Sequence, residues 1–167
     1  MEMSLDFWIT QVLTNFSLAM FLLAILFILF HTAVRIRYVS FYEIVYRWMA
    51  LFALGFTGIF TFVMHAFYAD TSAAMIGWSV SPFQYEVAMA DLALGVLGVF
   101  AFKASFGFRL ATVIAAVVIL WGDASGHLYQ MIVNGNFDLG NAGTWFWLDL
   151  IVPLILLICI GRLQYQA

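Results

Sequence analysis

Charged side chains are scarce in this sequence, since only 9% of the 167 residues are Asp, Glu, Lys or Arg and 66% are hydrophobic. Soluble domains are roughly 25% charged and about 45–50% apolar, so the composition excludes a water-soluble globular protein. The apolar runs are continuous and about twice as long as the ~10-residue alternating strands of a membrane β-barrel. We therefore predict an all-α, polytopic integral membrane protein whose first partner is the lipid bilayer.

Cysteine and basic residues are also rare. The single cysteine, Cys159, excludes an internal disulfide and a thiolate-rich metal site. The net charge is −3, and the few basic residues form no patch of the kind that binds nucleic acid. We therefore expect no nucleic-acid partner. The stretch from Met1 to Asp6 is acidic and lacks the basic start of a secretory signal, so we expect the first apolar run to be retained.

The apolar runs predict a single domain of five transmembrane helices, each close to the roughly 20 residues that cross a bilayer. The predicted spans cover residues 12–34, 48–70, 83–104, 110–133 and 145–160. Residues 39–47 fit either a short amphipathic surface helix or an early start of the second span. Residues 71–82 and 134–144 have the composition of loops, and Trp78 in the first of them is expected to anchor at the membrane interface.

Glycines recur inside the predicted spans at spacings that place them on one helix face. Small residues at such spacings let two membrane helices approach closely. We expect close helix contacts at three pairs: Gly55 and Gly58, Gly95 and Gly98, and Gly122 and Gly126.

The basic residues predict the orientation in the membrane. With five spans, all six fall on the same side: Arg35, Arg37, Arg47, Lys103, Arg109 and Arg162. The positive-inside rule assigns that side to the cytoplasm. The N-terminus is then expected outside and the C-terminus inside.

Polar side chains gather in the outer half of the predicted bundle. Asp123, His127 and Gln130 follow one another at i, i+4 and i+7, which is one face of a helix. Ionisable groups are costly against lipid, so this face is expected to point into the bundle. At 1.5 Å per residue, four ionisable residues lie about 5–10 Å and two about 12–15 Å from the outer interface. The first four are His65, Glu86, His127 and Asp149, and the two deeper residues are Asp91 and Asp123.

These residues predict a pocket that binds a metal ion or a small polar ligand, with residues 134–144 closing over it. Imidazole and carboxylate groups are common ligands of divalent transition metals. The predicted metal ligands are His65, Glu86, Asp123 and His127. The predicted contacts to a small polar ligand are Glu86, Asp91, Gln130 and Asp149. No Glu-x-x-His or His-x-x-x-His pair strengthens the metal interpretation.

Other functions fit the same residues. Carboxylates at two depths could relay protons or small cations. The polar groups could instead only specify helix packing in an accessory or assembly subunit, either in a homo-oligomer or in a larger membrane complex. His65 and His127 could be a pair of axial haem ligands, and quinone binding is a further alternative. No nucleophile motif is present, so an enzymatic role is left open.

Two motifs resemble a known family. The stretch from Gly77 to Glu86 reads G-W-x-x-S-P-F-Q-x-E, and the stretch from Gly126 to Gly143 reads G-H-x-Y-Q-M followed by N-F-x-x-G-N-A-G. They resemble an uncharacterised family of small bacterial inner-membrane proteins. The resemblance implies a bacterial cytoplasmic membrane and adds Asn141 to the predicted ligand contacts, beside Glu86, His127 and Gln130. It implies no activity.

Overall fold

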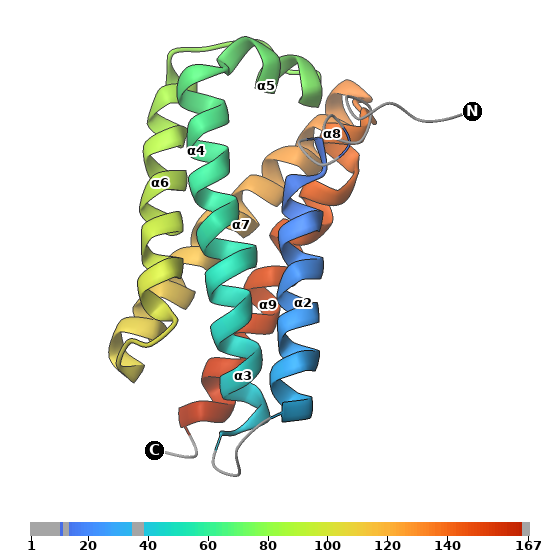
Figure 1. The fold of residues 1–167 in the computed structure, drawn as a ribbon. Coiled ribbons are helices and arrows are strands. Elements are labelled where there is room, and N and C mark those ends of the chain that lie inside the picture. Colours follow the sequence, from blue (N-terminus) through green and yellow to red (C-terminus); the bar gives the residue numbers. More distant parts are fainter. Residues whose placement is uncertain (1–10, 12–13, 35–38, 165–167) are drawn as a thin grey trace, which may run out of the picture.

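The computed structural model describes residues 11, 14–34 and 39–164, and within these ranges it contains helices and no strand. Five helices of this described part are long and apolar enough to cross a membrane. They are α2 (Phe16–Val34), the continuous helix α3–η1–α4 (Phe41–Phe67), α6 (Phe83–Ala101), α7 (Phe106–Asn134) and α9 (Thr144–Gln164). Figure 1 shows α2, α4 and α6 side by side, with α7 crossing the bundle obliquely. The predicted all-α class is confirmed for the described residues, and so is the presence of five helices that are long and apolar enough to cross a membrane, which fits a multi-pass membrane protein.

The second span begins earlier than predicted. Its first part, α3 (Phe41–Trp48), continues without a break into the π-helix η1 (Met49–Phe56) and then α4 (Thr57–Phe67). Of the two alternatives for residues 39–47, the early start of the second span therefore agrees with the structure from Phe41 onward. The two charged residues of α3 have partners within the protein. The two carboxylate oxygens of Glu43 each accept a hydrogen bond of 2.6 Å, one from Arg47 and one from Arg109. The polar face of α3 is thus satisfied inside the bundle.

Glycines bring the second and third spans into backbone contact. A Cβ atom on Gly58 would lie 2.7 Å from the Gly95 nitrogen, and one on Gly98 would lie 2.6 Å from the Gly55 nitrogen. The close approach predicted for these two glycine pairs is confirmed, because only residues without a Cβ fit there. The helix that carries Gly55 and Gly58 is therefore held at a fixed depth and distance from α6.

The third glycine pair was predicted wrongly. A Cβ on Gly122 would meet no atom within 4 Å, and one on Gly126 would meet only the Trp78 ring, at 3.5 Å. Both glycines line a cavity rather than a neighbouring helix. The spacing of glycines in the sequence shows only that one helix face lacks side chains. Whether that face contacts a helix or a cavity depends on the tertiary structure.

Both predicted loops contain a helix at the same end of the bundle. α5 (Ala69–Ile76) ends at Gly77, whose φ of 69° is left-handed and suits glycine. α8 (Leu139–Ala142) lies in the second connection. Figure 1 shows α5 lying across this end, with α8 beside it, and we call it the α5 end. The opposite end, where α3 begins, is the α3 end.

The two halves of the bundle differ in how they are filled. Ile44, Tyr46, Val113 and Leu156 have no exposed surface and belong to an apolar core in the half toward the α3 end. Buried apolar area of this kind stabilises the helix contacts. The half toward the α5 end instead surrounds a cavity.

Candidate ligand-binding pocket

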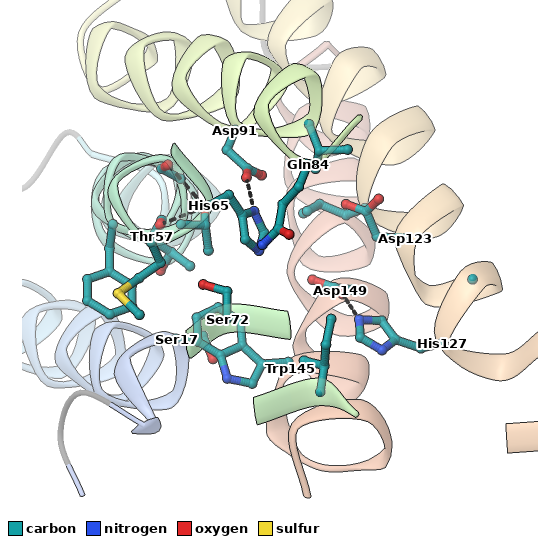
Figure 2. Close-up of a pocket in the computed structure, with 18 of the residues that line it drawn as sticks. Ser17, Thr57, His65, Ser72, Gln84, Asp91, Asp123, His127, Trp145 and Asp149 are labelled. Atoms are coloured by element: carbon teal, nitrogen blue, oxygen red, sulfur yellow. Dashed lines mark hydrogen bonds and ion pairs between the residues drawn. The ribbon is translucent and has the colours of Figure 1, made fainter. Parts of the chain in front are cut away.

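The cavity has a volume of about 470 Å³ and is lined by residues of α2, α4, α5, α6, α7 and α9. Three aspartates and two histidines face it: Asp91, Asp123, Asp149, His65 and His127. Figure 2 shows these side chains converging from different helices. We call this cavity the acidic pocket.

The first histidine is paired with an aspartate from the neighbouring helix. His65 on α4 and Asp91 on α6 lie 2.8 Å apart, measured from Nδ1 to Oδ2. Their helices are the two that glycines hold in backbone contact, and Asp91 carbonyl oxygen itself lies 2.8 Å from a Cβ built on Gly58. The pair is therefore positioned by rigid packing close by.

The second histidine is fixed by a buried amide. Asn141 has no exposed surface, and its Oδ1 lies 2.9 Å from both Trp78 Nε1 and His127 Nδ1. Its Nδ2 donates to the carbonyl oxygens of His127 and Asn136, at 3.2 and 3.0 Å. An indole N–H can only donate, so the atom it meets is the amide oxygen, and His127 Nδ1 must carry a proton to bond the same oxygen.

This network determines what His127 presents to the pocket. With Nδ1 acting as the donor to Asn141, the Nε2 atom of a neutral imidazole is an acceptor. Nε2 faces Asp149 Oδ2 at 3.9 Å, which is longer than a direct hydrogen bond. Two acceptors across such a gap can be joined by a donor placed between them. A ligand N–H group or a water O–H group would fit this role.

The acidic pocket has more carboxyl groups than basic side chains. Among the described residues, no Lys or Arg lines it, while three aspartates do. If both His65 and His127 were protonated, one carboxylate would still lack a positive partner. The electrostatics of the pocket therefore favour a cationic or proton-donating ligand over an anion.

Several pocket residues were not predicted from the sequence. Ser17 and Ser72 line the cavity, are 3% and 7% exposed, and have hydroxyl oxygens without a hydrogen-bond partner among the described residues. Ser17 lies near the start of the first predicted span and Ser72 in a predicted loop, so neither stood out. Trp78 was expected at the membrane interface, but its indole donates to Asn141 and its ring lies 5.4 Å from the His127 ring. Nothing in the sequence around Trp78 indicates that its indole N–H would bond to Asn141.

Three predicted contacts lie outside the cavity. Glu86 is exposed on α6 and does not line it, because each residue turns an α-helix by about 100° and Glu86 lies far around the helix from Gln84 and Asp91. Gln130 accepts a 2.6 Å hydrogen bond from Asn134 instead. Asn141 lies behind His127 and supports it.

The second connection does not form the predicted cover. None of residues 134–144 lines the cavity. Asn136 Nδ2 instead donates to the carbonyl oxygen of Ile76 at 2.8 Å, and Asn141 reaches His127. The connection therefore ties α5 to the back of His127 and supports the pocket from behind.

The four predicted metal ligands are not brought together. His65 pairs with Asp91, His127 pairs with Asn141 and faces Asp149, and Glu86 is outside the cavity. Within the described part of the chain, no group of three His, Cys, Asp or Glu side chains could hold a metal ion. The His65–Asp91 pair and the His127–Asp149 pair lie apart, and this arrangement better suits a ligand large enough to hydrogen-bond with both.

The fold and the pocket define a class of protein: a small helical bundle with five candidate membrane spans and an acidic cavity in one half. The chain matches, over residues 14–166, a family described as a family of unknown function (DUF6790), and it belongs to that family. The predicted membership of an uncharacterised family is thereby confirmed. No curated protein and no solved structure matches the chain.

Proposed function

We propose that this protein binds a small organic cation, such as a protonated amine, in the acidic pocket. The observation that carries the proposal is the charge count, in which three aspartates and no Lys or Arg line the cavity within the described residues. With neutral histidines and ionised aspartates, a ligand with one positive charge would offset part of the negative charge of the pocket. Its N–H groups would bridge His127 Nε2 and Asp149 across their 3.9 Å gap.

The size of the cavity supports an organic ligand over a bare ion. At about 470 Å³ it falls within the range of small-molecule sites, roughly 300–1,000 Å³. The buried hydroxyls of Ser17 and Ser72 also line it, and a ligand with polar groups would supply the partners they lack. A single metal ion would leave most of the cavity and both hydroxyls unused.

We also propose that the chain resides in a bacterial cytoplasmic membrane with the α3 end toward the cytoplasm. At that end, Arg47 and Arg109 share Glu43, and the Arg162 guanidinium lies 5.7 Å from the centre of the Tyr42 ring. This grouping supports the positive-inside assignment. The acidic pocket, in the other half, would then lie toward the periplasm. Arg35 and Arg37, which entered the prediction, lie outside the described residues.

Isothermal titration of the purified, untagged protein with butylamine tests the binding proposal. We expect saturable binding to the wild type, and a loss of affinity of at least about tenfold in Asp149→Asn, because a hydrogen bond to a charged group contributes roughly 1.5–3 kcal/mol. Asp70→Asn is the matched control, since it removes the same charge from an exposed position of α5 that does not line the cavity. Its affinity should equal that of the wild type.

Three results would overturn the proposal. Butyrate binding as well as butylamine would show that charge does not select the ligand. Stoichiometric binding of manganese or zinc, lost in His127→Ala, would favour the metal interpretation. Absence of binding, with lower stability in Asp149→Asn, would favour a packing role in an accessory subunit.

A further inference from the structure

Two hydroxyl groups in the acidic pocket are unusual for helical serines. Within an apolar helix, Ser and Thr commonly satisfy themselves by donating to a backbone carbonyl one turn earlier. Thr61, Thr112 and Ser125 do so here, with distances of 3.2, 2.9 and 2.7 Å to the carbonyl oxygen four residues before. The Ser17 and Ser72 hydroxyl oxygens have no hydrogen-bond partner among the described residues, which for Ser17 do not include the residue four positions earlier. Leaving a buried hydroxyl unbonded costs free energy, so these positions call for another partner.

The hydroxyls lie on other walls of the pocket than the carboxylates around His127. Ser17 belongs to α2 and Ser72 to α5, whereas Asp123 lies on α7 and Asp149 on α9. In the view of Figure 2, Ser17 and Ser72 are drawn on one side and Asp123 and His127 on the other, and all four line the cavity. A ligand that fills the cavity can therefore meet both groups at once. The two serine oxygens are covered in this structure, and rotation about the single χ1 bond would redirect each of them.

We propose that Ser17 and Ser72 form a second subsite that binds a hydroxyl group of the ligand, so that the preferred ligand is an amino alcohol. This inference rests on the proposed function, which supplies the ammonium subsite at His127 and Asp149. A serine hydroxyl both donates and accepts, as does an alcohol, so the two satisfy each other in either direction. The ligand's cationic end and its hydroxyl end would then occupy separate walls.

The charges argue against an anionic group at this subsite. A carboxylate there would share one low-dielectric cavity with three aspartates and no Lys or Arg among its described lining residues. A zwitterionic amino acid should therefore bind more weakly than the amino alcohol of the same length. The serine subsite thus restricts the expected ligands to molecules that have a cationic group at one end and a neutral hydrogen-bonding group at the other.

A titration series tests the inference with the full-length protein. The probes are the straight-chain amines from propylamine to hexylamine, the amino alcohols with the same carbon chains, and the matching amino acids. We expect the amino alcohol of the best-fitting length to bind about five- to tenfold tighter than its parent amine, the gain expected from one or two neutral hydrogen bonds. If no hydroxyl at any length improves affinity in the wild type, the inference fails although amine binding stands. If no amine binds, the proposed function itself fails.

The double variant Ser17→Ala/Ser72→Ala tests whether the preference for a ligand hydroxyl comes from these two serines or from differences in ligand solvation. It should abolish the advantage of the hydroxyl, measured within the variant as the ratio of the dissociation constants of the parent amine and its amino alcohol. Ser125→Ala is the control, since it removes a hydroxyl that is exposed and bonded to Trp121, and it should keep the advantage. Because unbonded buried hydroxyls are costly, the double variant should unfold at the same temperature as the wild type or higher. A hydroxyl preference that survives in the folded double variant would overturn the assignment.

Discussion

At the scale of single residues, Asn141 joins several segments of the chain beside the pocket. It is fully buried, and one amide group joins Trp78, His127 and Asn136. Those partners come from three different segments of the chain, so the amide connects the first loop, α7 and the second loop. It also determines which His127 nitrogen faces the cavity. Asn141 therefore acts on the ligand through His127, as a positioning residue.

We expect Asn141→Leu to lower the free energy of unfolding by about 2–4 kcal/mol, because it keeps the volume but removes the partner of the buried His127 Nδ1–H and of the partly buried Trp78 indole N–H. Unfolding in detergent, followed by tryptophan fluorescence, measures the change. Nitrogen NMR shifts of labelled histidine should report a protonated Nδ1 at His127 in the wild type and a loss of that preference in the variant. Asn134→Ala, at an exposed site, should change stability by less than about 0.5 kcal/mol. Equal stability and an unchanged His127 tautomer in Asn141→Leu would contradict this role.

At the scale of elements, the contact between α4 and α6 positions one wall of the pocket. Backbone meets backbone at Gly58 and Gly95, and the same two helices carry His65 and Asp91. Helices that touch through glycines have little freedom to slide, because each backbone fits into the groove left by the missing side chains. The 2.8 Å histidine–aspartate pair depends on that fit.

We expect Gly58→Ala to destabilise the protein by about 1–3 kcal/mol, since the new methyl group would lie 2.7 Å from the Gly95 nitrogen and backbone atoms cannot rotate away. The same change should weaken butylamine binding by moving His65 away from Asp91. Gly122→Ala is the matched control, because no atom lies within 4 Å of its added methyl group and alanine favours helix by roughly 1 kcal/mol. Thermal unfolding of both variants checks the contrast, and equal loss in both would show that the contact is not tight.

At the scale of the whole molecule, polar chemistry is divided between the two ends. At the α3 end, Arg109 donates to Glu43 and to the carbonyl oxygens of Ala101 and Phe102, and its guanidinium lies 5.0 Å from the centre of the Tyr46 ring. Those contacts compensate a buried positive charge and close that end. The other half holds the acidic cavity. A pocket accessible from one side of the membrane fits this division.

Fusions at the C-terminus test the proposed orientation in a bacterial host. With the α3 end in the cytoplasm, a green fluorescent protein placed after Ala167 should fluoresce, and alkaline phosphatase at the same position should be inactive, because it folds only after export. The basic residues at this end supply the physical reason. Active phosphatase together with a dark fluorescent protein would reverse the orientation, and the pocket would then face the cytoplasm.

The sequence predicted the class of fold and part of the pocket for identifiable reasons. Continuous apolar runs reveal membrane helices because every backbone polar group must be satisfied inside lipid. Histidines and aspartates in such runs are costly enough to imply an interior position, so His65, Asp91, Asp123, His127 and Asp149 were all expected to face a cavity, and they line one. Glu86 was expected there too, but depth along a span says nothing about rotation around it.

Composition and periodicity by themselves thus determined that this chain forms five apolar helices and that most of the ionisable groups in their outer halves would lie inside the bundle. Only the tertiary structure decided which groups meet. Asn141 reaches His127 through a folded connection, Gly122 borders a cavity instead of a helix, and Ser17 and Ser72 line the same cavity from two different helices. The physical reason is that the tendency of a segment to be buried depends on its own residues, whereas a binding site depends on the rotation and depth of several helices. Helix packing sets the rotation and the depth, and residues distant in the sequence determine that packing.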